Sequence, residues 1–273
     1  MTDFLEKNLV PIFLSLASII LSGVVGIYWI YFNDYSISPD NSNWGDFGSF
    51  VGGVSSAFLS FLTILLLALT LKNQSKLSRI TQFEQSFFEL FNLHQSITEK
   101  MDGEVQINTT VDWAPKPYHG LGYINACSQF LENEFSGISD LVRITDRDKK
   151  VNLKKSFQSE IDECYDFLYK GKETQLGHYF RSIYNIMKFI NESNVPEKKK
   201  YFDLLQSFLT DSELHLIFYN GIGRHGRKRL RQLMDEYSFL ENIHPKGQTF
   251  LEHFKQFYPK TYTNHIEKPS YDT

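Results

Sequence analysis

Two long runs of uncharged residues lie in the first quarter of the chain. The second run, residues 47–71, has 25 residues without a charge, and residues 8–33 form the first. As a helix, 25 residues would extend roughly 37 Å, which exceeds the hydrocarbon thickness of a bilayer at about 30 Å. A buried helix of a soluble protein is seldom so long without a charge. The pattern therefore predicts two membrane spans, over about residues 9–32 and 47–71.

The residues that flank the two runs predict their orientation. Aromatic residues end the first run, as is typical of a membrane interface: Tyr28, Trp29, Tyr31 and Phe32. Lys7 precedes the first run, basic residues follow the second from Lys72 on, and the connection between them has Asp but no Lys or Arg. The positive-inside rule then puts both termini in the cytoplasm. The alternative for the first run, a cleaved signal peptide, requires a positively charged start that this chain lacks.

Small residues recur at helical spacing in the second run. Gly48 and Gly52 lie four residues apart, as do Gly53 and Ala57. Such spacing lets two helix backbones approach closely within a membrane. Two interpretations remain open: these residues pack the hairpin against itself, or they also join copies of the chain into a homo-oligomer.

Beyond residue 72 the pattern changes to that of amphipathic helices. Apolar positions follow a 3.6-residue period, and strand-like alternation is nearly absent. Residues 103–120, with two Pro and two Gly, predict a loop. Helices are predicted to about residue 102 and over 121–145, 150–170, 174–193, 197–209, 211–220, 226–242 and 247–257. The predicted fold is all-α, with a transmembrane hairpin (1–72), a helical cytoplasmic domain (73–260) and a tail (261–273).

Charge and rare residues narrow the function classes only slightly. Residues 1–71 account for the whole net charge of −4, so the remainder is neutral and favours neither nucleic acid nor an acidic substrate. Both cysteines, Cys127 and Cys164, lie in amphipathic stretches and indicate reduced core thiols. The eight His form no H-E-x-x-H motif and no pairing with Cys, so neither a metal nor a cofactor is expected.

Residues 221–226, Gly-Ile-Gly-Arg-His-Gly, match the G-x-G-x-x-G pattern of dinucleotide sites. Such a site needs a strand before the glycines and a helix after them. Here Thr210 and Glu213 form a capping-box pattern, so the preceding segment is predicted to be a helix. The glycines are therefore expected to end one helix and start another.

Five basic residues follow within eight positions, at the expected N-terminus of that next helix: Arg224, Arg227, Lys228, Arg229 and Arg231. Free N–H groups and the helix dipole favour an anion at such a place. The ligand would be a phosphate of nucleic acid, nucleotide or lipid. The alternative is a solvated basic face, balanced by the acidic residues that follow.

A polar stripe, His178, Arg181 and Asn185, borders the apolar face of the helix predicted over 174–193. Some all-α ribonucleases use an Arg and a His four to six residues apart on one helix, but no His follows Arg181 at that spacing. The stripe is expected either to serve function or to hydrogen-bond neighbouring helices. Glu213 would serve as a catalytic acid, although the capping box already accounts for its presence.

Several short motifs, in this order, resemble a known family. They are Trp44-Gly-Asp-Phe-Gly, Glu84-Gln-Ser-Phe-Phe-Glu-Leu-Phe with His94, Gly177-His-Tyr-Phe-Arg-Ser-Ile-Tyr, and Ser212-Glu-Leu-x-Leu-Ile-Phe-Tyr-Asn220. The chain resembles the phage abortive infection proteins of AbiC type over about residues 44–245. Residues that match the family motifs, and whose role the resemblance leaves open, are Tyr179, Phe180, Arg181, Tyr219 and Asn220.

The resemblance implies a bacterial inner-membrane protein that limits phage spread by halting or killing the infected cell. It supplies no catalytic residue. The leading hypothesis is an effector without enzymatic activity, whose helical domain senses a phage-derived trigger or a co-encoded defence protein and whose hairpin perturbs membrane lipid. The alternatives are a membrane-tethered α-helical ribonuclease toxin and a scaffold for another defence protein.

Overall fold

The structure is a computed structural model and describes residues 2–33, 39–107, 114–145, 153–244 and 247–261. Apart from residue 261, the predicted tail lies outside the described residues. The chain divides into two compact units, unit 1 (Met1–Thr81) and unit 2 (Gln82–Thr273). The domain limits at residues 72 and 260 stay predictions.

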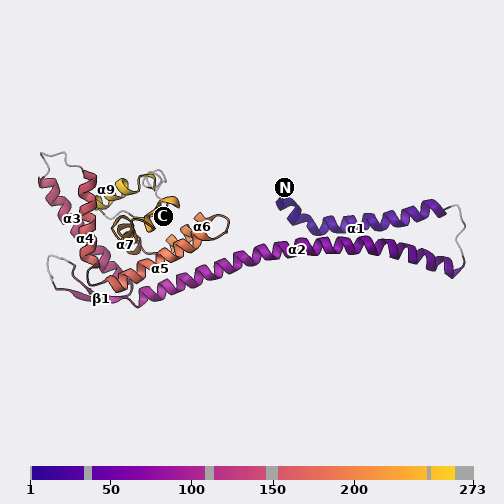
Figure 1. Cartoon of the computed structure of the whole chain (residues 1–273), viewed down its shortest axis with the longest axis horizontal. Coiled ribbons are helices and arrows are strands. Elements are labelled where there is room, and N and C mark those ends of the chain that lie inside the picture. The colour runs from indigo at the N-terminus through magenta and orange to yellow at the C-terminus, as the bar shows by residue number, and fades with distance from the viewer. Residues whose placement is uncertain (1, 34–38, 108–113, 146–152, 245–246, 262–273) are drawn as a thin grey trace, which may run out of the picture. The chain divides into compact units, whose positions relative to one another are not determined.

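Unit 1 consists of two antiparallel helices (Figure 1). Helix α1 spans Thr2–Phe32, and α2 spans Asn41–Glu99, of which residues 41–81 belong to this unit. Both helices are long and apolar enough to cross a membrane. They touch through a narrow line of side chains, with Val24 and Leu62 buried and the rings of Tyr28 and Phe47 4.7 Å apart.

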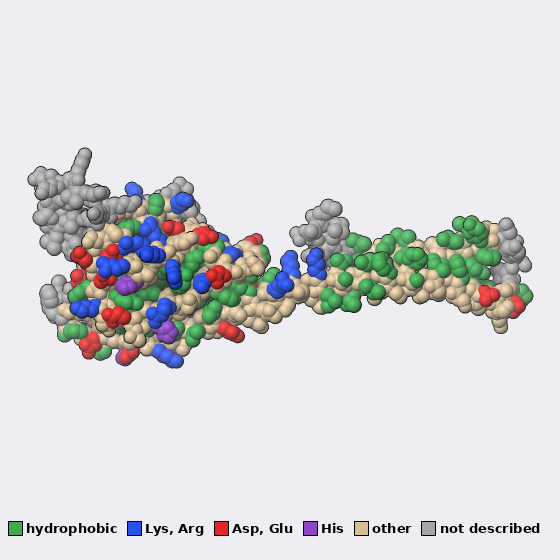
Figure 2. Space-filling view, in the orientation of Figure 1, with side chains coloured by type: hydrophobic (Ala, Val, Ile, Leu, Met, Phe, Trp, Pro, Cys, Tyr) green, Lys and Arg blue, Asp and Glu red, His purple; other side chains and the backbone are tan. Residues whose placement is uncertain are grey.

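Most apolar side chains of unit 1 face outward instead. Trp29, Ile30 and Tyr31 are 71%, 72% and 76% exposed, and Figure 2 shows hydrophobic side chains along the outside of both helices. Such a surface is far larger than the apolar patches that water-soluble monomers expose. Within this chain both helices are thus left mostly uncovered, unlike the mostly buried core helix of a soluble protein.

The glycines of the second run do not contribute to the α1–α2 contact. A Cβ built on Gly48, Gly52 or Gly53 would have no other atom within 4 Å. No side chain of α1 therefore packs on these three glycines, and the interpretation that the small residues of the two runs pack the hairpin against itself stays a prediction. Their packing against a second copy stays a prediction.

Unit 2 is helical, and the all-α prediction is confirmed. Its helices after α2 are α3 (Leu121–Thr145), α4 (Leu153–Tyr169), α5 (Glu173–Glu192), α6 (Lys198–Ser207), α7 (Asp211–Ile222), α8 (Leu230–Glu236) and α9 (Gly247–Phe257). The predicted ranges agree closely with six of these seven helices. The exception is the helix predicted over 226–242: α8 is shorter, and turns precede and follow it.

The segment predicted as a loop contains a short hairpin. Strands β1 (Asp102–Val105) and β2 (Lys116–His119) pair antiparallel, with Asp102 opposite His119, and the pair packs on α3. Gly120 turns the chain into α3 with φ +55°, a conformation that favours glycine. Strands of four residues, one of which contains Pro117, carry almost no alternating pattern, which is why the prediction missed them.

Helix α7 is the central helix of unit 2. Every residue from Glu213 to Ile222 is buried, and the helix contacts α3, α4 and α8 (Figure 1). The predicted capping box is confirmed, because the Glu213 carboxylate accepts the Thr210 N–H at 2.8 Å while the Thr210 hydroxyl accepts the Glu213 N–H at 3.4 Å. A helix buried all round needs apolar residues on every face, which explains why its sequence resembles a buried strand.

The last turns of α2, which belong to unit 2, pack against α5 and α6 through aromatic rings. Phe83 stacks on Phe189 at 5.0 Å, and the Tyr201 hydroxyl donates to Glu84 at 2.9 Å. Helix α2 is continuous to Glu99, as predicted for the helix that follows the second run.

Candidate functional site

The G-x-G-x-x-G segment is a tight connection between α7 and α8, and each glycine is needed for close packing. A Cβ on Gly226 would lie 2.4 Å from the Asn220 carbonyl oxygen, and one on Gly223 would lie 2.9 Å from the Tyr219 carbonyl oxygen. A Cβ on Gly221 would lie 2.8 Å from the Tyr258 hydroxyl. No strand precedes the glycines, since α7 does. The pattern is therefore explained by packing and does not form a dinucleotide fold.

The basic residues do not begin a helix at residue 226 as predicted. Residues 224–229 form successive turns, and α8 starts at Leu230. The turn is stabilised by the backbone of Gly226, whose N–H donates to the Asn220 carbonyl at 3.1 Å and whose carbonyl accepts from Leu230 at 3.0 Å. We call residues 221–229 the basic turn. Because no helix begins at residue 226, a helix N-terminus there does not support anion binding. Anion binding by these side chains stays a prediction.

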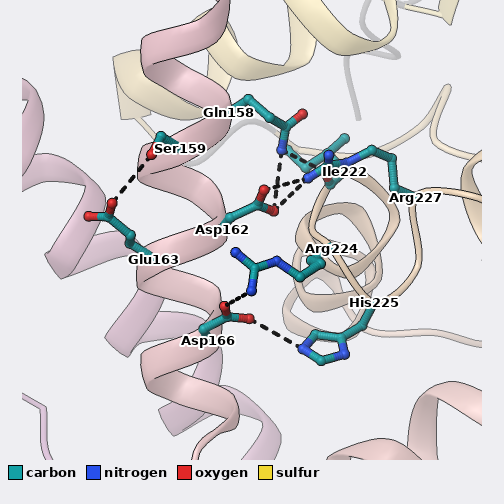
Figure 3. Close-up of polar contacts among 9 residues, drawn as sticks. All are labelled: Gln158, Ser159, Asp162, Glu163, Asp166, Ile222, Arg224, His225 and Arg227. Atoms are coloured by element: carbon teal, nitrogen blue, oxygen red, sulfur yellow. Dashed lines mark hydrogen bonds and ion pairs between the residues drawn. The ribbon is translucent and has the colours of Figure 1, made fainter.

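Arg227 joins the basic turn to α4 (Figure 3). Its guanidinium contacts both carboxylate oxygens of Asp162, at 2.6 and 2.7 Å, and its Nε donates to the Ile222 carbonyl at 3.0 Å. Gln158 donates to that same carbonyl, also at 3.0 Å. These groups satisfy the carbonyl at the end of α7, so Arg227 has a structural role.

Asp166, also on α4, contacts the side chains of Arg224 and His225 (Figure 3). One oxygen lies 3.1 Å from Arg224 Nη1, and the other lies 3.3 Å from His225 Nε2. The imidazole also stacks on Tyr169, with ring centroids 4.5 Å apart and an interplanar angle of 23°. Both basic side chains remain solvent-accessible, at 67% for Arg224 and 41% for His225.

The other basic residues differ in their contacts. Arg231 donates to the Phe257 carbonyl at 2.9 Å and pairs with Asp235 at 3.7 Å, so it joins α8 to the end of α9. Lys228 and Arg229 are exposed. The five predicted anion-binding residues therefore separate into structural ones and accessible ones.

The polar stripe on α5 faces solvent. His178, Arg181 and Asn185 are exposed, while Tyr179 and Phe180 from the same motif are buried. The predicted apolar face is buried as well. Among the residues that the structure describes, the stripe has no catalytic partner, and its function stays open.

A buried polar cluster joins α2, α5 and α7, and the sequence did not reveal it. His94 Nδ1 lies 2.6 Å from the Ser182 hydroxyl, and His94 Nε2 lies 3.9 Å from the Glu213 carboxylate. The Tyr179 hydroxyl donates to that carboxylate at 3.4 Å. Because the Ser182 hydroxyl donates its one proton to the Tyr179 carbonyl at 2.7 Å, the bond at Nδ1 must be donated by the imidazole.

This cluster favours an ionised Glu213. Burial raises the pKa of the carboxyl, but the His94 ring and the Thr210 N–H and hydroxyl outweigh it and hold the pKa below its ordinary value. Glu213 thus both caps α7 and fixes the end of α2. The cluster contains no nucleophile exposed to a substrate, which favours a structural role.

The family-motif residues Tyr219 and Asn220 are also buried. The Asn220 amide donates to the Tyr165 hydroxyl at 2.6 Å, and Tyr219 Oη lies 3.4 Å from His253 Nδ1. Burial lowers the pKa of His253 to about 4, so this imidazole is neutral at pH 7. Tyr219 borders a pocket of about 30 Å³ beside Phe135 and Phe250, with room for about one water molecule.

Residues 171–247 match the family model putAbiC, putative phage abortive infection protein. The resemblance to the abortive infection family is confirmed over this segment. The putAbiC segment covers α5 to α8, and so contains the polar stripe, the central helix and the basic turn. It supports an anti-phage defence role. No curated protein and no solved structure matches the chain.

The putAbiC segment does not extend over α4, whose carboxylates hold the basic turn. Among the described residues there is no group of three His, Cys, Asp or Glu side chains that would hold a metal ion. Both cysteines are buried, and burial raises the pKa of the Cys127 thiol to about 12, so Cys127 is not a reactive thiolate.

Proposed function

We propose that this chain is a membrane-anchored component of anti-phage defence, in which the hairpin of unit 1 perturbs the inner membrane once unit 2 binds a trigger. The putAbiC match over residues 171–247 carries the proposal. It supports the defence role, and the physical chemistry of unit 1 supports the membrane as the place of action.

Unit 1 is suited to a lipid environment. Most of its apolar side chains face outward, and several of its Ser and Thr hydroxyls bond carbonyls of their own helix, as Thr63 does to Leu59 and Thr70 to Leu66. In hydrocarbon no water is present to satisfy polar groups, so each must be satisfied within the protein. The absence of charge over residues 8–33 and 47–71 also agrees with a lipid environment.

Charge at the ends of the two runs supports an orientation with both termini in the cytoplasm. The positive-inside rule counts Lys and Arg close to the spans, and they lie before the first run and after the second. Reporter fusions after Lys72 and within residues 36–43 test it. We expect a cytoplasmic signal from the first fusion and a periplasmic signal from the second, whereas a periplasmic signal after Lys72 would overturn the orientation.

The membrane step requires association of hairpins. The face of α2 that contains Gly48 and Gly52 is unoccupied in the single chain, so a second hairpin would approach there closely. The trigger must bind the associated arrangement better than the resting one, because a ligand shifts an equilibrium only by its differential affinity. A phage-derived molecule or a co-encoded protein would act in this way.

The test is to follow membrane potential and RNA integrity together in infected cells that express the chain. The proposal predicts loss of potential, read with a voltage-sensitive dye, while RNA stays intact. Cleaved RNA before any loss of potential would instead establish the tethered ribonuclease. Protection only when a neighbouring gene is also present would establish the scaffold.

A further inference from the structure

Three elements of unit 2 bring basic and aromatic groups together around Tyr169, at the end of α4. His225 of the basic turn stacks on one side of the tyrosine ring at 4.5 Å. A Cβ built on Gly177 would lie 2.7 Å from the Tyr169 hydroxyl oxygen and 3.1 Å from Arg181 Nη1. Both groups are therefore close to Gly177, and Arg181 of α5 approaches the Tyr169 hydroxyl. The polar stripe and the basic turn, separate in the sequence, thus meet at this ring.

Gly177 makes this meeting possible. It is buried on α5, and any side chain there would overlap the Tyr169 hydroxyl and press on the Arg181 guanidinium. Glycine in the middle of a helix is unfavourable relative to alanine. Its presence is explained by the close approach of the hydroxyl and the guanidinium.

The group contains two guanidinium groups, Arg181 and Arg224, with the Asp166 and Glu173 carboxylates near them. Asp166 is the carboxylate that pairs with both Arg224 and His225, and Arg181 has no ion-pair partner among the residues described here. Burial raises the pKa of Tyr169, the Arg181 cation opposes this rise, and the Glu173 carboxylate adds to it, as expected if both charged groups lie close to the hydroxyl. By contrast, Arg227 is committed to Asp162.

We propose that Arg181, Arg224 and the Tyr169–His225 ring pair form a binding site for a nucleotide phosphate. The two guanidinium groups bind the phosphate, since arginine matches phosphate oxygens with paired hydrogen bonds. The accessible imidazole, fixed by Asp166 and the tyrosine ring, offers a flat surface to the base. The ligand is a free nucleotide or one unit of a single strand, and the site does not depend on the membrane role proposed above.

The test measures binding to the purified full chain in detergent micelles, with three probes: a labelled single-stranded oligoribonucleotide, ATP and inorganic phosphate. We expect Arg181→Gln and Arg224→Gln each to weaken binding of the nucleotide probes by about tenfold or more, as the loss of a charged hydrogen bond implies. Binding should also weaken as salt rises. Tighter binding of the oligonucleotide than of ATP identifies a strand, and equal binding identifies a free nucleotide.

Two further variants separate a site from general attraction. Lys188→Gln removes one positive charge from the same helix, at a side chain that is 49% exposed and pairs only with its neighbour Glu192, and should change binding less than about twofold. Gly177→Ala retains every charge but displaces the Tyr169 hydroxyl, and should weaken binding while the circular dichroism spectrum is unchanged. Equal losses in Lys188→Gln and Arg181→Gln, binding only to anionic lipid vesicles, or no binding of any nucleotide probe would overturn the proposal.

Discussion

The two units use the same kinds of apolar side chain in opposite ways. Unit 2 buries most of its large rings, with Phe87 and Phe218 fully buried, whereas unit 1 exposes most of its aliphatic and aromatic side chains (Figure 2). The absence of charge over residues 8–33 and 47–71 already separates the two cases in the sequence, and burial separates them in the structure. The outward apolar surface of unit 1 requires a non-aqueous environment or further protein to cover it, whereas unit 2 covers its apolar side chains with its own core.

Polar groups differ between the units in the same way. In unit 1, hydroxyls bond carbonyls three or four residues earlier in their own helix, as Ser56 does to Gly53. In unit 2, polar side chains join elements that are far apart in sequence, as Arg227 joins the basic turn to Asp162. The hydroxyl hydrogen bonds of unit 1 thus stay within single helices, although the buried Ser55 hydroxyl makes none with the described residues, whereas unit 2 depends on its tertiary contacts.

The largest expected effect comes from removing a buried ring. Phe218→Ala should lower the free energy of unfolding of unit 2 by about 3–5 kcal/mol, because it leaves a cavity at the centre of α7. Phe61→Ala in unit 1 removes the same ring from a side chain that is 63% exposed and should leave unit 2 unchanged. Denaturant unfolding of the full chain in micelles measures both. Similar losses in the two variants would break the contrast between the units.

The next effect is a pH dependence that only unit 2 should have. The pKa of His253 is lowered from 6.5 to about 4 by burial, so below pH 6.5 the unfolded chain binds a proton that the folded chain excludes. Stability is then fully present above pH 6.5 and is lost as the pH falls from 6.5 to about 4, by roughly 3 kcal/mol in total.

His253→Gln removes this titration and should flatten the stability curve between pH 6.5 and 4. The Glu213 carboxyl acts at lower pH, because its pKa is below the ordinary value of 4.5. Its contribution is present above that value and is lost as the pH falls through the lowered pKa. An unchanged slope in His253→Gln would show that another group is responsible.

A smaller effect separates the arginines of the basic turn. Arg227→Ala leaves the largely buried Asp162 unpaired and should cost about 2 kcal/mol of stability. Arg229→Ala removes an exposed side chain and should change stability by less than about 0.5 kcal/mol. Thermal unfolding of the two variants compares them directly. Equal stabilities would mean that the ion pair with α4 does not anchor the turn.

Much of the fold could be predicted from the sequence because its signals are local. Capping by Thr210 and Glu213, the apolar face of α5 and the uncharged runs each lie within one element. The short hairpin of β1 and β2 was missed, since four-residue strands carry too few positions for a periodic pattern. The helix predicted from residue 226 was too long, because residues 224–229 form successive turns and α8 starts only at Leu230.

The candidate site could be predicted only in part, because its contacts are distant in sequence. Arg181 was singled out from the sequence but His225 was not, and nothing local indicated that both lie beside Tyr169. His94 and Glu213 lie on different helices, and their pairing depends on how α2 packs against α7. To predict such contacts, one must know how each helix is rotated about its own axis relative to the helices it packs against.

The central claim is that the hairpin acts in the membrane and is more than an anchor. Gly48→Leu with Gly52→Leu places bulky side chains on the unoccupied face of α2 and should prevent close approach of a second hairpin. Phe61→Leu with Ile64→Leu, at exposed apolar positions of the same helix, is the matched control.

Phage plating on cells that express each variant at matched membrane levels gives the answer. The account predicts that the double-glycine variant inserts, keeps unit 2 folded, cross-links less between copies and no longer protects cells, while the control protects fully. Full protection by Gly48→Leu with Gly52→Leu would contradict the account, because an anchor needs only length and hydrophobicity.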